Sequence, residues 1–74
     1  MKVELKFYKH TGNIDSPIEF IKEVSGIYVV IPVISTQVVI NNEIYIVWDI
    51  THTYKEDSEG VEYLNIDIML SPLS

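Results

Sequence analysis

Apolar and charged residues alternate at the start of the chain. Val3, Leu5 and Phe7 are each separated from the next by a charged residue. This period of two is typical of a strand with one buried face. The pattern predicts a strand from Lys2 to Lys9, ended by the turn residues Thr11-Gly12-Asn13.

The next segment carries a helix signature. Ser16 precedes a proline and stands three residues before Glu19, which is the spacing of a capping box with proline at the first helical position. Apolar residues then recur every three positions, at Ile18, Ile21 and Val24. The spacing predicts a short helix over residues 17–24; the alternative is an irregular loop with a few inward hydrophobic side chains.

Runs of β-branched and aromatic residues after Gly26 predict four further strands. Asn41-Asn42 between two such runs predicts a tight hairpin turn, because asparagine accepts positive φ. Pro32 interrupts the first run, which is typical of an edge position or a bend. The four predicted strands are Ile27–Ile31, Gln37–Ile40, Glu43–Tyr54 and Val61–Leu70.

The longest predicted strand has apolar residues on both faces. Ile44, Ile46 and Trp48 share one face, whereas Tyr45 and Val47 share the other. A small domain cannot bury both faces of one strand. Either a bulge near Trp48 changes the inward face, or a partner chain covers the second face.

Composition fits a single small β domain over residues 1–74. The chain has nine valines, twelve isoleucines and no alanine, which favours strands over helices. It has no cysteine, which excludes disulfides and thiolate metal sites. We expect a mainly β fold: a five-stranded, antiparallel, strongly bent sheet or small SH3-like barrel, since curvature hides strand edges. The predicted core is Val3, Leu5, Phe7, Ile18, Ile21, Val29, Ile31, Val38, Ile40, Val47, Ile50, Leu64, Ile66 and Ile68.

Part of this pattern resembles a family. The spacing runs from Ile31-Pro32 through Val38–Glu43 to a strand that contains Tyr45, Val47, Ile50, His52 and Tyr54. In these positions the chain resembles small uncharacterised SH3-like β-barrel proteins of phages and bacteria, over residues 27–70. The resemblance departs at Asn42, where glycine is usual. It implies a fold and a phage or mobile-element origin, and it transfers no functional site.

Charge and chemistry exclude several classes of function. The net charge is −6 and there is no arginine, so we expect no direct binding to nucleic acid. His52 and Asp49 are three residues apart, so on a regular strand they face opposite sides and form no dyad. The acidic residues from Glu56 to Glu62 lack the ligand spacing of a calcium loop. We therefore expect no enzyme activity, no catalytic residue, no metal and no cofactor.

No segment is apolar over the length of a bilayer span. The longest apolar run, Ile27–Ile34, is far shorter than the ~20 residues of a membrane helix. The N-terminal residues lack the apolar core of a signal peptide. We expect a soluble, cytoplasmic protein with no membrane partner.

An apolar and aromatic surface is the strongest functional signal. Five tyrosines and one tryptophan are many rings for 74 residues, and such rings are enriched at protein interfaces. With a mean hydropathy of +0.18, the chain is expected to form a homo-oligomer, most simply a symmetric dimer, and/or to bind another protein. The predicted interface residues are Tyr28, Val30, Ile44, Tyr45, Ile46, Trp48 and Tyr63.

Two functions follow from these observations. The first is a small protein-interaction or structural module that acts through this apolar and tyrosine surface. The alternative is an acidic inhibitor that mimics nucleic acid and blocks a basic nucleic-acid-binding surface of another protein. The acidic residues bunch near one loop rather than spreading along a face, so the sequence favours the module.

Overall fold

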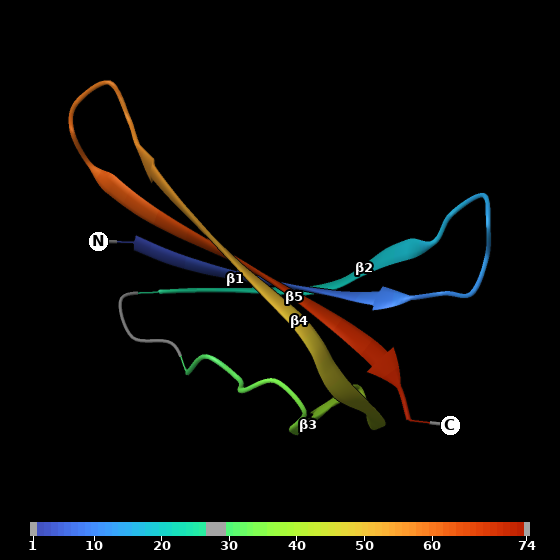
Figure 1. The fold of residues 1–74 in the computed structure, drawn as a ribbon. Helices are drawn as coiled ribbons and strands as arrows, with labels where there is room; N and C mark the ends of the chain where they lie inside the picture. The colour runs from blue at the N-terminus through green and yellow to red at the C-terminus, as the bar shows by residue number, and fades with distance from the viewer. Residues whose placement is uncertain (1, 27–29, 74) are drawn as a thin grey trace.

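The chain folds into one curled sheet of five strands. The computed structural model describes residues 2–26 and 30–73 (Figure 1). Across the sheet the strands follow the order β2-β1-β5-β4-β3, and the sheet curls into a half-barrel. The predicted mainly β class is confirmed. The strands are β1 (Lys2–His10), β2 (Ile18–Gly26), β3 (Gln37–Ile40), β4 (Glu43–Glu56) and β5 (Glu62–Pro72).

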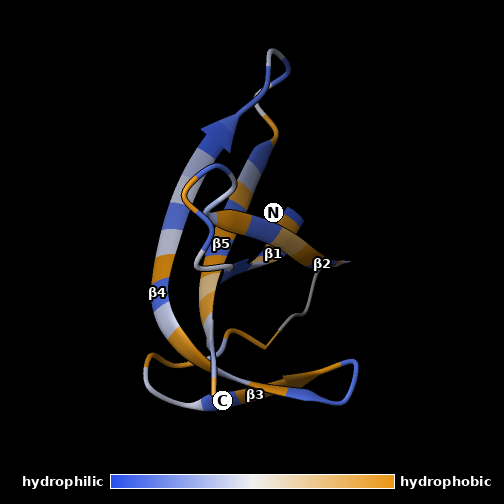
Figure 2. Ribbon diagram, turned by 90° about the vertical axis from the view of Figure 1, so that its right-hand side faces the viewer, coloured by the Kyte–Doolittle hydropathy of each residue, from blue (hydrophilic) through white to orange (hydrophobic). Residues whose placement is uncertain are grey.

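The core lies on the concave side of the sheet, which we call the inner face. Alternate residues of the central strand β5 point to it, and directly paired residues of neighbouring strands share a face. Figure 2 shows this alternation as bands of opposite hydropathy along β5. The buried residues are Leu5, Phe7, Ile40, Tyr45, Val47, Leu64, Ile66, Ile68 and Leu70, with Val3, Ile21, Val38 and Ile50 packed against them.

The sheet is mixed, so the prediction of a purely antiparallel sheet is wrong. β1 runs parallel to β5, whereas the other three strand pairs are antiparallel. Strands joined by a short turn are antiparallel by necessity. The β1–β5 pair joins two segments from opposite ends of the chain, and local sequence patterns carry no information on such a pairing.

The predicted helix over residues 17–24 is also wrong, because this segment forms β2. The capping signature does not operate: the carbonyl oxygen of Ser16 accepts a hydrogen bond from the Thr11 hydroxyl, and Pro17 accepts one from the Thr11 amide at 3.0 Å. These contacts close the β1–β2 connection. Pairing with β1 then satisfies the backbone of β2 in place of helical hydrogen bonds.

A bulge in β2 explains why its apolar spacing resembles a helix. The register with β1 skips Ile21, which lies between the partners of Phe7 and Tyr8. An extra residue breaks the period of two. Ile21 packs against the core and Val24 lies on the inner face three positions later, so a bulged strand shows the spacing of a helix face.

The β3–β4 hairpin turn is confirmed. Asn41 and Asn42 have φ values of 52° and 66°, the left-handed conformation that a two-residue hairpin turn requires. Of the predicted strand Ile27–Ile31, residues 27–29 lie outside the described residues, and Val30 and Ile31 belong to no strand. The second of the five strands is therefore β2.

The predicted core needs four corrections. Ile18 and Ile31 are 48% and 38% exposed, because Ile18 lies on the outer face of an edge strand and Ile31 lies in a connection. Tyr45 and Leu70 are buried although the predicted core does not contain them. Val29 lies outside the described residues.

Strands β2 and β3 form the two edges of the sheet. No ladder joins them among the described residues, so the half-barrel stays open between them. The described part of the chain also contains no helix long and apolar enough to cross a membrane.

Candidate interaction surface

Four rings gather on the side of the sheet opposite the core, which we call the outer face. They are Tyr8 and His10 of β1, Phe20 of β2 and Trp48 of β4; we call them the outer aromatic group. Tyr8 is paired with Phe20 on one side and with Met69 on the other, so it lies opposite the inward-facing Phe7. Alternation along β1 thus sets the position of Tyr8 and His10.

Trp48 reaches the outer face through a bulge in β4. Val47 is paired with Leu70 and Asp49 with Met69, so Trp48 is the extra residue. The sequence leaves two explanations open, a bulge near this residue or a partner chain over the second face, and the structure shows the bulge. The Trp48 ring lies edge-on to that of His10, with centroids 6.5 Å apart, and Trp48 remains 66% exposed.

The second ring pair lies over β1 and β2. The centroids of Tyr8 and Phe20 are 5.7 Å apart and their planes meet at 63°, a favourable edge-to-face arrangement. A hollow of about 210 Å³ beside them is lined by Tyr8, Ile18, Asp67 and Met69. This hollow therefore offers an aromatic ring, aliphatic walls and one carboxylate, Asp67.

The predicted interface residues do not all lie on one surface. Tyr45 is 3% exposed and belongs to the core, so it is not part of an accessible surface. Val30 is exposed in the connection before β3, and Tyr28 lies outside the described residues. The register places the remaining predicted residues on the outer face: Ile44, Ile46, Trp48 and Tyr63.

Three members of the outer aromatic group are absent from the interface that the sequence predicts. The alternation of β1 places Tyr8 on the outer face, so the sequence pattern alone is sufficient to predict its position. The sequence pattern assigns Phe20 to the apolar face of the predicted helix, because the bulge in β2 gives this strand the apolar spacing of a helix. His10 gains its role only from contact with Trp48, a residue of a distant strand.

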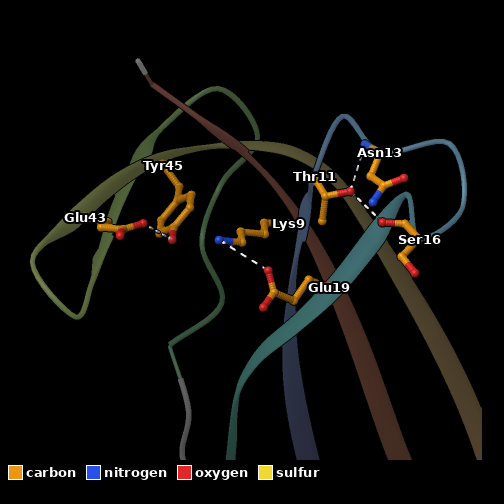
Figure 3. A network of polar contacts seen from close by, with 7 residues as sticks. All are labelled: Lys9, Thr11, Asn13, Ser16, Glu19, Glu43 and Tyr45. Carbon is orange, nitrogen blue, oxygen red and sulfur yellow. Dashed lines mark hydrogen bonds and ion pairs between the residues drawn. The ribbon is translucent and has the colours of Figure 1, made fainter.

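A polar network closes one end of the inner face (Figure 3). Lys9 of β1 and Glu19 of β2 form an ion pair at 3.3 Å. The Tyr45 hydroxyl donates a hydrogen bond to Glu43 Oε2 at 2.6 Å. The bond to Glu19 raises the pKa of Lys9, and the bond to Glu43, reinforced by burial, raises the pKa of Tyr45. These groups satisfy one another and stabilise the sheet end.

The β4–β5 turn is held by the Asp57 carboxylate. Its Oδ1 accepts hydrogen bonds from the Glu59 and Val61 amides at 2.8 and 2.9 Å, and its Oδ2 accepts one from the Tyr63 hydroxyl at 3.3 Å. The bond from Val61 is the main cause that lowers the pKa of Asp57. The Asp57 carboxylate therefore stabilises the β4–β5 turn in which it lies.

The two residues weighed as a catalytic pair lie apart. His52 is paired with the buried Ile66 and so belongs to the inner face, whereas Asp49 is paired with Met69 on the outer face. Within residues 2–26 and 30–73, no group of three or more His, Cys, Asp and Glu side chains is arranged to hold a metal ion.

Comparison of the chain with protein-family models, with curated proteins and with solved structures gives no match in any of the three. The resemblance to small phage and bacterial β proteins therefore stays a prediction.

Proposed function

We propose that this chain is a small protein-interaction module that binds its partner through the outer aromatic group. The observation that carries the proposal is the position of Trp48: a bulge in a paired strand holds its ring on the outer face, two-thirds exposed and beside His10. A bulge next to a large exposed ring re-aims that side chain at the cost of a regular ladder.

Physical chemistry supports a protein as the partner. Tyrosine, tryptophan and phenylalanine bury much area with few rotatable bonds, and they dominate the energetics of protein interfaces. The outer aromatic group rests on paired strands, so its rings are arranged before the partner arrives, which lowers the cost of binding. The curled sheet is compatible with the SH3-like barrel that the resemblance implies.

The alternative, an acidic inhibitor that mimics nucleic acid, has weaker support. Glu56, Asp57, Glu59 and Glu62 gather at one hairpin end, and Asp57 is bonded to the backbone of its own turn. A mimic needs free carboxylates at regular intervals along a face. The net charge of −6 supports the module equally, since charge keeps an apolar protein soluble.

Affinity capture with matched variants tests the proposal. Trp48→Ala removes the central ring, and Tyr54→Ala removes a ring of similar exposure, 70%, on the inner side of the same strand. We expect Trp48→Ala to weaken binding of the protein that the wild type captures from cell lysate by roughly 30-fold, the equivalent of about 2 kcal/mol for a central interface aromatic. Tyr54→Ala is expected to leave capture unchanged.

The same capture at low and high salt separates the two functions. An aromatic interface retains its partner at high salt, because apolar contacts are not screened. A nucleic-acid-binding partner that is lost as salt rises, and that both variants retain, would support the mimic and overturn the module.

A further inference from the structure

The chain exposes more surface than a compact monomer of its size. Its accessible surface is 5347 Å², about 700 Å² above the roughly 4,650 Å² expected for 8.5 kDa. The radius of gyration is 13.5 Å, against about 11 Å for a compact chain of this length. A standard interface takes about 800 Å² from each partner, so the excess matches one partner's share.

Charge is absent from one long part of the chain. All five lysines and all eleven acidic residues lie outside residues 24–42. The described residues of this stretch, 24–26 and 30–42, comprise the end of β2, the connection into β3, β3 itself and its turn. We call them the neutral flank. Figure 2 shows the connection and β3 as mostly hydrophobic.

The neutral flank exposes several aliphatic side chains, although Ile40 is buried in the core and Val38 packs against it. Val33 is 66% and Val39 64% exposed, although both are β-branched residues that favour a packed sheet. A hollow of about 260 Å³ opens beside Val39, between the two sheet edges. Its lining contains a single charged residue, Lys22, among Phe7, Val24, Val38, Val39, Ile40 and Asn41.

We propose that a second copy of this chain covers the neutral flank, flank against flank, about a two-fold axis. Two chains of charge −6 repel each other, and the neutral flank allows them to approach without opposing carboxylates. A neutral aliphatic patch is complementary to itself, which a two-fold interface requires. The surface in excess of a compact monomer, about 700 Å² over the whole molecule, is close to the area that one partner of a stable dimer buries.

This proposal names one partner of the module and uses a different surface from the outer aromatic group. No residue of the neutral flank belongs to the outer aromatic group, although Ser35 and Thr36 are hydrogen-bonded to Val47, the residue before Trp48. The two proposals therefore fail separately: a dimer that captures no partner through Trp48 overturns only the module. A monomer whose capture of partner depends on Trp48 overturns only the dimer.

The molar mass in solution tests the dimer. We expect light scattering at micromolar concentration to give twice the 8.5 kDa of one chain. Val33→Glu and Val33→Lys each bury a charge at the interface, and both are expected to give monomers. Ile14→Glu places the same charge at a 96% exposed position in the β1–β2 connection, and it is expected to remain dimeric.

Three results would overturn the proposal: a monomeric wild type, a dimeric Val33→Glu variant, or a monomeric Ile14→Glu variant. The last would show that net charge alone controls association. Because Val33 is exposed and outside the strands, its variants are expected to keep the wild-type circular dichroism spectrum. Hydrogen exchange gives a second readout: on dilution of the wild type below its dissociation constant, amides in 30–40 lose protection while those around Ile14 do not change.

Discussion

Trp48 and His10 hold their rings edge to face across the central strand β5, with planes at 86°. The two residues belong to strands that are not neighbours in the sheet. They meet because the bulge in β4 supplies one residue more than the ladder needs. A single inserted position thus links the outer surfaces of β1 and β4.

Deletion of Trp48 is expected to preserve the fold. The residues on either side, Val47 and Asp49, are already paired with the consecutive residues Leu70 and Met69, so the deletion restores a regular ladder. We expect a folded protein with a slightly lower melting temperature and without partner capture. Circular dichroism and thermal unfolding measure the first two effects.

Deletion of Ile46, two residues earlier, is the matched control. It removes a residue from a regular part of the strand, so either Tyr45 (3% exposed) or, if the bulge closes, Val47 (1% exposed) turns away from the core. Loss of a buried large side chain costs about 3–5 kcal/mol, which is most of the stability of a domain this small. Equal stability of the two deletion variants would contradict the assignment of the bulge.

How far the sequence predicts the fold depends on whether the signal is local. The alternation in β1 and β5 and the Asn41-Asn42 turn are predicted correctly, because each depends on neighbouring residues. The β2 segment is predicted wrongly, since its bulge around Ile21 gives a strand the apolar spacing of a helix face. The parallel β1–β5 pair has no local signal at all.

The candidate surface, too, can be predicted from the sequence only where the signal is local. The presence of apolar residues on both faces around Trp48 is a local signal, and the bulge that exposes this ring is one of the two explanations that it leaves open. It does not exclude Tyr45 from the interface, because burial of that residue depends on the closure of the sheet end around Glu43. His10 and Phe20 join the surface only through contacts between strands.

Alkaline pH is expected to destabilise the sheet end that contains Tyr45. The folded state raises the pKa of Tyr45 and of Lys9 through their carboxylate partners. A raised pKa adds stability that is complete below the unfolded value, about 10 for both groups, and is lost as pH rises through the folded value. Melting temperatures between about pH 8 and about pH 11.5, a window that brackets these values, measure this loss.

Tyr45→Phe isolates the contribution of the phenol. This variant cannot ionise at residue 45, so its melting temperature is expected to fall less than that of the wild type as the pH rises. Tyr54→Phe, at an exposed position, is expected to follow the wild type. If the melting temperature of Tyr45→Phe fell with rising pH as steeply as that of the wild type, the hydrogen bond to Glu43 would have no part in the loss of stability.

Acid pH is expected to loosen the β4–β5 turn. The folded state lowers the pKa of Asp57, mainly through the hydrogen bond from the Val61 amide. A lowered pKa adds stability that is present above the unfolded value, about 3.9, and is lost as pH falls through the folded value. Amide exchange at Glu59 and Val61 is therefore expected to accelerate between about pH 4 and about pH 2, beyond the intrinsic effect of pH.

Asp57→Asn provides the comparison for this turn. The amide keeps one acceptor oxygen but does not titrate, so the acid-dependent part of the exchange is expected to disappear. Thermal unfolding of both proteins from about pH 6 to about pH 2 then gives the difference due to Asp57 alone. Identical pH profiles would show that the carboxylate does not hold the turn.

The parallel β1–β5 pair also has a consequence for the order of folding. The two central strands lie at opposite ends of the sequence, so the β1–β2 hairpin and the β3–β4 hairpin can form early, yet neither encloses a core alone. The long stretch of chain between β1 and β5 slows the formation of this native strand pair. During synthesis, the strands that precede β5 therefore keep their apolar faces uncovered until β5 has been made, and exposed apolar strands of this kind are prone to aggregation.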